Sequence, residues 1–455
     1  MKVLLVNPPA GSIYALLRLK SPPLGLAYVG AALRQAGHKV KIADLNVEQT
    51  DYTSLPYADF DAVGISVDTM RYPAAVKIAE AAKRHNRTVI AGGQHVTFFD
   101  SEALSTGWFD FVVRGEGEHT IVDLVDRIEE GDSFDQVKGI SYVSQGELVR
   151  TEDRPLIKDL DALPFPARDL FPLRRYTTTL HGRPMSAALT SRGCPFNCDF
   201  CACSQFFGRS WRTRSLESVT EELEFLRKHY DYRAVAFFDD NFTLKPKRMI
   251  DFCEEVLRRK WDMYWWAFSR VDTVVGHEEV IRLMAKAGLK QVFVGFESGS
   301  QEVLDQYGKD LDVDKAFRAV EILRKYKISV WASFIIGALN ETKKMIKQTV
   351  KYANKLNPDF TQFGILTPYP GTALYEKVKN RLLTTDWRKF WGGDPVIKLD
   401  KLSARQLKKL FWRANLSFYA RPKRLFSVVL PFVLRTSRDS VRKNGILSAN
   451  GSSDR

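Results

Sequence analysis

The sequence predicts an α/β protein with a doubly wound N-terminal domain, a partial barrel of six βα units and a basic, helical C-terminal region. Two observations lead to this fold class. Short apolar strands alternate with helical patterns in two long stretches of the chain, as in parallel βαβ units. The 455 residues are 45% hydrophobic and 27% charged, which is typical of a globular protein and excludes a disordered or fibrous chain.

Residues 1–135 contain the first set of βαβ units. Five apolar strands are expected, at 2–7, 39–44, 62–67, 88–92 and 111–115. They predict a doubly wound sheet, which binds ligands at the carboxyl ends of its strands. Residues 136–180 are expected to form a small hairpin, with Gln145 and Gly146 at its turn, and an ordered linker that contains several prolines.

Residues 181–385 repeat the alternation. Six strands are expected, at 186–191, 234–240, 263–270, 291–298, 329–337 and 360–366. They fit a partial or complete βα barrel, in which the chemistry takes place at the carboxyl ends of the strands. Residues 386–443 are expected to be the basic helical region, and residues 444–455 a disordered tail.

The positive charge is concentrated near the C-terminus. The net charge is +14, and residues 401–443 contribute +11 of it. Apolar residues with helical spacing lie in this stretch; they are Leu407, Leu410, Phe411, Ala414 and Phe418. For residues 405–419 two interpretations stay open, a helix that packs on the core or a helix on a membrane. For residues 421–435 we expect a segment that binds an anionic membrane surface.

The N-terminus shows no targeting segment. Its apolar run stops at Pro8 and Pro9 and is better explained as a buried first strand. No stretch reaches the ~20 apolar residues of a membrane-spanning helix. We therefore expect a cytoplasmic protein that is peripheral on the membrane.

Four of the five cysteines lie between positions 194 and 203. Cys194, Cys198 and Cys201 have the spacing C-x3-C-x2-C, directly after the first barrel strand. Three thiolates can hold three irons of a [4Fe–4S] cluster and leave the fourth iron open to another ligand. A structural zinc site needs a fourth ligand, and Cys203 is too close to Cys201 for tetrahedral zinc. We expect Cys203 and Cys253 not to be ligands.

The motif C-x3-C-x-Phe-C after the first strand of a βα barrel resembles the radical S-adenosylmethionine (SAM) superfamily. The preceding domain resembles the Rossmann-like, cobalamin-binding domain of that superfamily's cobalamin-dependent branch, and the resemblance covers residues 1–375. It implies that the free iron chelates SAM. An electron passed through the cluster then cleaves SAM to a 5′-deoxyadenosyl radical, which takes hydrogen from an unactivated carbon. An electron donor such as ferredoxin or flavodoxin is implied.

The resemblance also implies roles for residues around the motif and after the second barrel strand. Phe200 matches an aromatic position near the adenine of SAM, with ordinary packing as the alternative. Asp239, Asp240 and Asn241 match the position that holds the methionine amino group, since carboxylates accept hydrogen bonds from an ammonium. The alternative for these three residues is a helix N-cap.

Further positions match at the ends of the later strands. Arg270, next to Ser269, is a candidate for the SAM carboxylate or a substrate acid. Glu297 and Ser298 are candidates for the ribose hydroxyls. Gly337 and Glu341 resemble the glycine-containing motif under the adenine.

In the N-terminal domain, Ser66, Gly92 and Gly93 match the places where the family packs the buried nucleotide tail of cobalamin, and residues 113–118 also match. Glycines there would permit close approach of a bulky ligand. The Asp-x-His-x-x-Gly motif, which supplies a lower cobalt ligand in methionine-synthase-like domains, is absent after the first strand. We therefore expect cobalamin without a protein histidine on cobalt. The four histidines of this domain are expected to be structural or at the surface, with His95 closest to the glycine pair; they are His38, His85, His95 and His119.

Three classes of function are consistent with a cluster-binding cysteine motif. The leading hypothesis is a radical SAM enzyme that methylates an unactivated carbon, or forms a carbon–carbon bond or ring, on a lipid-like substrate. The alternative is a radical enzyme that modifies tRNA, such as a methylthiotransferase. Those relatives usually carry additional N-terminal cysteines and a C-terminal β-barrel, whereas here every cysteine lies at 194 or beyond. Nucleic acid is therefore not expected as a partner. A non-enzymatic iron–sulfur protein is disfavoured by the polar strand ends.

Overall fold

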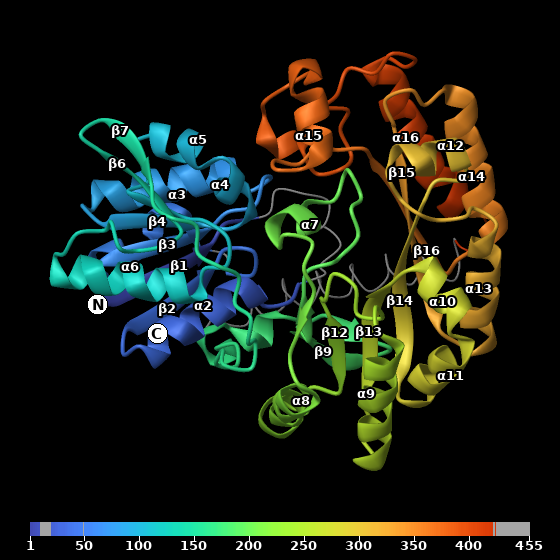
Figure 1. Cartoon of the computed structure of the whole chain (residues 1–455), viewed down its shortest axis with the longest axis horizontal. Helices are drawn as coiled ribbons and strands as arrows, with labels where there is room; N and C mark the ends of the chain where they lie inside the picture. Colours follow the sequence, from blue (N-terminus) through green and yellow to red (C-terminus); the bar gives the residue numbers. More distant parts are fainter. Residues whose placement is uncertain (10–19, 49, 422–423, 425–455) are drawn as a thin grey trace, which may run out of the picture.

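The computed structural model of the chain contains two α/β bodies joined by a linker (Figure 1). It describes residues 1–9, 20–48, 50–421 and 424. The N-terminal body, blue and cyan in Figure 1, stands beside the curled sheet of the barrel, and α7 (Ala202–Phe206) lies between the two. The fold class predicted from the sequence is confirmed.

The N-terminal domain is built on a seven-stranded sheet of order β2-β1-β3-β4-β5-β6-β7. The strands are β1 (Lys2–Asn7), β2 (Lys39–Asp44), β3 (Ala62–Ser66), β4 (Thr88–Gly92), β5 (Phe111–Val113), β6 (Ile140–Ser144) and β7 (Glu147–Arg150). The first five pair in parallel. The expected hairpin forms as β6 and β7, and it extends this sheet antiparallel to β5. The helices are α2 (Leu24–Gln35), α3 (Tyr72–Arg84), α4 (Gln94–Phe98), α5 (Asp100–Ser105) and α6 (Glu118–Glu130).

The barrel sheet has the order β16-β15-β14-β13-β12-β9-β8. Its strands are β8 (Thr179–Leu180), β9 (Arg183–Ala188), β12 (Ala234–Phe237), β13 (Tyr264–Ser269), β14 (Leu289–Glu297), β15 (Ser329–Ile336) and β16 (Phe360–Ile365). The six strands from β9 to β16 pair in parallel, and β8 pairs antiparallel with β9. β8 and β16 are the edges of this sheet, so the barrel is partial. A short antiparallel ribbon, β10 (Ser191–Arg192) and β11 (Arg212–Thr213), follows β9.

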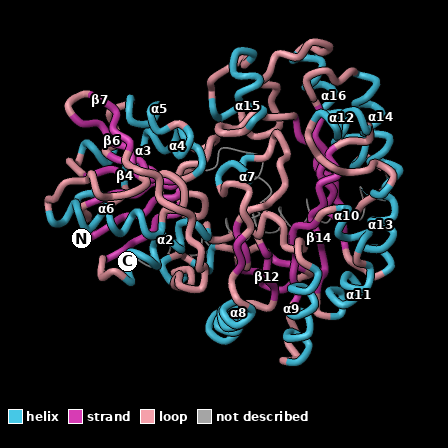
Figure 2. Tube along the Cα trace, viewed as in Figure 1, coloured by secondary structure: helices cyan, strands magenta, loops and turns pink. Residues whose placement is uncertain are grey.

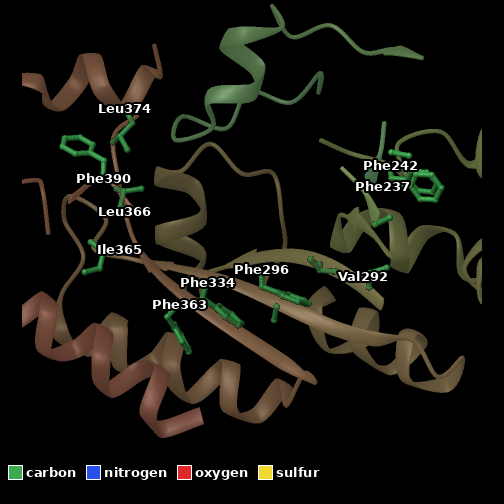
Figure 3. Close-up of a cluster of buried hydrophobic side chains, with 14 of the residues drawn as sticks. Phe237, Phe242, Val292, Phe296, Phe334, Phe363, Ile365, Leu366, Leu374 and Phe390 are labelled. Atoms are coloured by element: carbon green, nitrogen blue, oxygen red, sulfur yellow. The ribbon is translucent and has the colours of Figure 1, made fainter. Parts of the chain in front are cut away.

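Helices cover the outer side of the curled sheet (Figure 2). They are α8 (Leu216–Tyr230), α9 (Pro246–Arg258), α10 (Val271–Gly276), α11 (Glu278–Lys286), α12 (Gln301–Gln306), α13 (Lys315–Lys325), α14 (Lys343–Leu356) and α16 (Ala404–Tyr419); α15 (Ala373–Val378) lies nearer the N-terminal domain. Alternate strand residues point toward these helices and form the main core. Phe296, Phe334 and Phe363 stack across β14, β15 and β16, with ring centroids 5.9 and 5.3 Å apart (Figure 3).

An aromatic contact joins the N-terminal domain to the segment after the barrel. His95 lies 5.0 Å from Trp387 between ring centroids, and Phe99 lies 5.3 Å from Tyr375. Trp387 Nε1 donates to Glu102 at 2.7 Å. His95 is fully buried, and burial lowers its pKa to about 3, so its ring stays neutral. His95 is therefore a structural residue that packs between the N-terminal domain and the segment after the barrel.

The C-terminal helix α16 packs on the core. Ser403 and Gln406 form a capping box at its start. The apolar stripe seen in the sequence is buried, and the helix packs against β16 and α14. The membrane interpretation of that stripe is therefore wrong, because the core occupies it. No helix within the described residues is long and apolar enough to cross a membrane. Of the expected membrane segment at 421–435, only Arg421 and Arg424 are described, and the expected tail at 444–455 lies outside the described residues.

Candidate active site

The site lies at the carboxyl ends of the barrel strands, where they face the N-terminal domain. A cavity of about 520 Å³ lies between the two bodies. Ser66, Gly92 and Gly93 line it from the N-terminal side, and Arg192 and Asp240 line it from the barrel side. The cavity therefore connects the ends of β3 and β4 with the loop that carries the three motif cysteines.

The cysteine loop begins with a glycine that its backbone requires. Gly193 has a φ of +89°, and a Cβ there would lie 2.2 Å from the carbonyl oxygen of Ser210. The Gly193 N–H donates to Asp240 Oδ2 at 3.0 Å. The start of the loop is thus fixed one residue before Cys194.

The three motif cysteines come together in the folded loop. The Cys201 N–H donates to the Cys198 carbonyl at 3.0 Å, which turns the chain back on itself. The three cysteines lie within eight residues of this one loop. Burial raises the pKa of the Cys194 and Cys198 thiols. Three thiols gathered at a strand end are the donor set of a cluster with one open iron.

Cys203 lies beside this set. Its interaction with Cys201 lowers the pKa of the Cys201 thiol to about 7. Cys203 also contacts the carboxylate of Asp240. Cys253 is buried within α9, where burial raises its pKa to about 12.

The three residues of the Asp-Asp-Asn sequence after β12 differ in their surroundings: Asp239 and Asn241 are buried, and Asp240 lines the cavity. Asp239 is fully buried and accepts hydrogen bonds from the Thr190 N–H at 2.7 Å and from the Thr190 and Ser191 hydroxyls at 2.5 Å. This carboxylate holds the segment after β9. Asn241 is buried, and its Nδ2 has no partner among the described residues. Of the three residues, Asp240 is the one that lines the cavity.

Arg270 supports the cysteine loop. Its guanidinium stacks over the ring of Phe196, 3.7 Å from the centroid, and pairs with Asp272 at 3.0 Å. Phe196 lies between Cys194 and Cys198 in the sequence, so the cation packs directly on the loop. Ser269 shares a hydrogen bond with Thr243 at 2.9 Å.

The end of β14 carries a buried ion pair. Glu297 has a φ of +59°, which is uncommon for a residue with a side chain. Its Oε1 lies 2.5 Å from Lys309 Nζ, and both side chains are 8% exposed. Ser298 instead bonds Thr349 at 3.1 Å in the packing of α14. Glu297 therefore lies at the strand end as predicted, and its carboxylate is paired.

Gly337 and Glu341 form a tight turn after β15. Gly337 has a φ of +90°, and a Cβ there would lie 2.9 Å from the Leu407 side chain. Glu341 Oε2 accepts from the N–H groups of Gly337 and Ala338 at 2.5 and 3.1 Å. Its Oε1 is buried without a partner among the described residues, and burial raises the pKa of Glu341 to about 7. Phe200 packs edge-on against Tyr307 with centroids 5.4 Å apart.

Two family models match the chain. The model described as the radical SAM superfamily matches residues 189–353, and the B12 binding domain model matches residues 13–125. The chain is 40% identical to Uncharacterized methyltransferase PH0819 of Pyrococcus horikoshii, over 93% of each chain. The chain belongs to the cobalamin-binding branch of the radical SAM superfamily. It is an enzyme of this superfamily, and its cofactors are a [4Fe–4S] cluster, SAM and cobalamin.

Other members of the branch are similar along most of the chain. An anaerobic magnesium-protoporphyrin IX monomethyl ester cyclase of Rubrivivax gelatinosus is 30% identical, over 90% of this chain and 75% of that protein. The hopanoid C-3 methylase of Methylococcus capsulatus is 29% identical, over 86% and 75%. The solved structure of the methyltransferase TsrM from Kitasatospora setae shares the fold, with a TM-score of 0.68, 20% identity and coverage of 83% and 74%.

The residues present fit the cofactors of this branch. The N-terminal wall of the cavity is rich in glycine, so a bulky ligand can approach the backbone closely. A Cβ on Gly93, whose φ is +123°, would lie 2.7 Å from the Val67 carbonyl oxygen. On the barrel side, Glu341 Oε1 and Asn241 Nδ2 are buried polar atoms without partners among the described residues. The three motif thiols are the donors that a [4Fe–4S] cluster with one open iron needs.

The structure thus gathers Asp240, Ser66 and the glycine pair around one cavity, and the motif cysteines begin two residues after Arg192 in its wall. Sequence reasoning missed Lys309, which neutralises Glu297, and Arg192, which lines the cavity two residues before Cys194. The one signal for Arg192 was its position inside the segment that leads to the motif. Its partners lie more than 70 residues away in the sequence.

Proposed function

We propose that this enzyme methylates an unactivated carbon of an apolar, lipid-like substrate. One SAM would be cleaved to methionine and a 5′-deoxyadenosyl radical, which would take the substrate hydrogen and leave as 5′-deoxyadenosine. A second SAM would give its methyl group to that carbon and leave as S-adenosylhomocysteine. A low-potential donor such as ferredoxin or flavodoxin would supply the two electrons that balance this exchange. Bound cluster and cobalamin supply the radical and methyl-transfer chemistry.

The observation that carries the apolar substrate is a row of aromatic rings across the barrel sheet. Phe268 pairs with Phe293, Phe293 with Trp331, and Trp331 with Phe360 in the strand register. The ring centroids are 5.1, 5.8 and 6.3 Å apart. All four side chains are half-buried. The residues next to each of them in its own strand are buried and face the outer helices; examples are Ala267, Val292 and Ala332.

The row therefore lies on the inner face of the curled sheet. It continues toward Phe238, which contacts Phe268 at 6.4 Å and also lines the cavity. Four neighbouring strand spacings of ~4.8 Å make this surface about 19 Å long. Such a surface suits a flat or extended hydrocarbon better than a charged nucleic acid.

The relatives favour methylation of such a substrate. A hopanoid methylase and a methyltransferase are among them. The cyclase relative favours a second candidate, ring closure by the same radical. Isotope labelling separates the two reactions, because only methylation moves the SAM methyl group to the product.

The experiment compares lipid extracts of cells with and without the gene after growth on methionine with a CD3 group. The proposal expects an apolar compound that carries one additional CD3 group and depends on the gene. An unlabelled product that depends on the gene would favour cyclisation. Unchanged lipids with a labelled RNA nucleoside would overturn the lipid substrate.

The outer face of α16 supports association with an anionic membrane. Trp412 and Leu416 are 44% and 62% exposed, and Arg405, Lys409 and Arg413 flank them. Interfacial helices combine apolar side chains with cations in this way. We expect the double variant Trp412→Ser, Leu416→Ser to sediment less with phosphatidylglycerol vesicles than Leu257→Ser, an exposed apolar residue of α9. Equal sedimentation of both variants would contradict this role.

A further inference from the structure

We propose that Arg192 is a positioning residue that couples the two cofactor sites. With Glu116, Glu118 and Arg212 it would hold the cysteine loop against the wall of the cobalamin cavity. Cluster binding and cobalamin binding would then strengthen each other through this contact. The proposal concerns the cofactors alone and does not depend on the substrate.

Arg192 bridges two glutamates of the N-terminal domain. Its Nη1 lies 2.8 Å from Glu116 Oε1, and its Nη2 lies 2.6 Å from Glu118 Oε1. The two glutamates lie in the turn from β5 into α6 and at the first residue of α6. Arg192 itself is the last residue of β10 and stands two residues before Cys194. The contact thus joins the domain that binds cobalamin directly to the cluster loop.

A second arginine completes the network. Arg212 pairs with Arg192 across the β10–β11 ribbon, and it contacts both carboxylate oxygens of Glu116 at 2.8 and 3.1 Å. Glu116 also accepts from the Ile157 N–H at 2.8 Å. The side chains are 4–11% exposed. Removing one partner from such a buried set leaves an uncompensated charge, so the set acts as a unit.

The network is itself part of the cavity wall. Glu116, Glu118 and Arg192 all line the cavity of about 520 Å³. The next residue, Gly193, is anchored to Asp240 of the barrel. The cluster loop is therefore held at two adjacent residues: the N-terminal domain binds Arg192, and the barrel binds Gly193. A ligand that fills the cavity contacts the side chains that hold the loop, and by thermodynamic linkage the effect is reciprocal.

A second buried network offers a matched control. Arg168 and Arg214 pair with the two oxygens of Glu222, and all three are at most 5% exposed. These residues do not line the cavity. Glu222→Gln and Glu118→Gln are therefore the same chemical change at comparable burial, one inside the barrel and one between the two sites.

The test measures the dissociation constant of hydroxocobalamin by absorbance titration, for iron-free and cluster-reconstituted full-length protein. In the natural protein, cluster loading is expected to tighten cobalamin binding roughly fivefold or more. Glu118→Gln should bring this ratio close to one. Arg192→Lys keeps the charge but reaches only one glutamate, so its ratio should fall in between. Glu222→Gln should lower thermal stability and leave the ratio unchanged.

Two results would overturn the proposal. One is a ratio near one in the natural protein. The other is an equal loss of the ratio in Glu222→Gln and Glu118→Gln, because that outcome reflects general destabilisation. Iron content and thermal stability are recorded for each variant. If Glu118→Gln does not fold, Arg192→Lys decides the question through its intermediate ratio.

Discussion

Replacing Glu341 with glutamine is expected to remove a pH-dependent loss of stability from the barrel. Glu341 is fully buried in the turn after β15, and burial raises its pKa from 4.5 to about 7. The folded state thus holds this proton more tightly than the unfolded chain. The resulting stabilisation is complete below pH 4.5 and is lost as the pH rises through 7.

The size of the effect follows from the two pKa values. Each pKa unit corresponds to about 1.4 kcal/mol, so the full loss is about 3 kcal/mol. About 2 kcal/mol of it falls between pH 5.5 and pH 8.5. For a domain of the size of the barrel, this corresponds to roughly 4 to 8 °C in Tm. The glutamine side chain of the variant has no such titration, and its amide oxygen can still accept from the two backbone N–H groups.

The assay compares the Tm of the natural protein and of Glu341→Gln at pH 5.5 and pH 8.5, with equal iron content. The natural protein should lose roughly 4 to 8 °C relative to the variant between the two pH values. Glu302→Gln, at an exposed position of α12, serves as a control whose difference stays flat. A difference between natural protein and Glu341→Gln that is the same at both pH values would refute this account of Glu341.

Two further predictions concern the cofactor sites. Changing any one of the three motif cysteines to Ala should remove most of the iron and all reductive cleavage of SAM, because three thiolates are the minimum set. Cys203→Ala should keep both, and loss of iron from that variant alone would show that the ligands are misassigned. Gly92→Trp should reduce cobalamin binding at least tenfold, because its Cβ points into open cavity space near Val113. Gly276→Trp, outside the cavity and with no atom within 4 Å of the added Cβ, should bind cobalamin normally, and equal binding by both variants would place cobalamin elsewhere.

The strands and the cysteine motif are features that the sequence predicts well. The apolar run at 2–7 coincides with β1, because nearly continuous burial in a parallel sheet leaves a local signature. The run at 39–44 coincides with β2, an edge strand of which the last three residues are buried. The three cysteines lie within eight residues, so their spacing alone indicates a cluster loop. Positions at strand ends, such as Glu297 and Asp240, also followed from the predicted strands.

The partners of these residues were not predictable, because they come from other elements. Asp239 has the same surroundings in sequence as Asp240, yet its carboxylate is occupied by hydroxyls after β9, 48 and 49 residues away. Glu116 and Arg192 meet across 76 residues. The stripe of α16 fits both a core and a membrane, since helical periodicity shows which face is apolar and not what covers it.

We propose that this enzyme uses two SAM molecules to place a methyl group on an apolar substrate. The most direct measurement is the product ratio in a single reaction of reconstituted enzyme with SAM that carries a CD3 group, cobalamin, a low-potential reductant and a lipid extract. We expect one 5′-deoxyadenosine and one S-adenosylhomocysteine for each CD3 group found in an apolar product. Formation of 5′-deoxyadenosine with an unlabelled apolar product, and without S-adenosylhomocysteine, would contradict it.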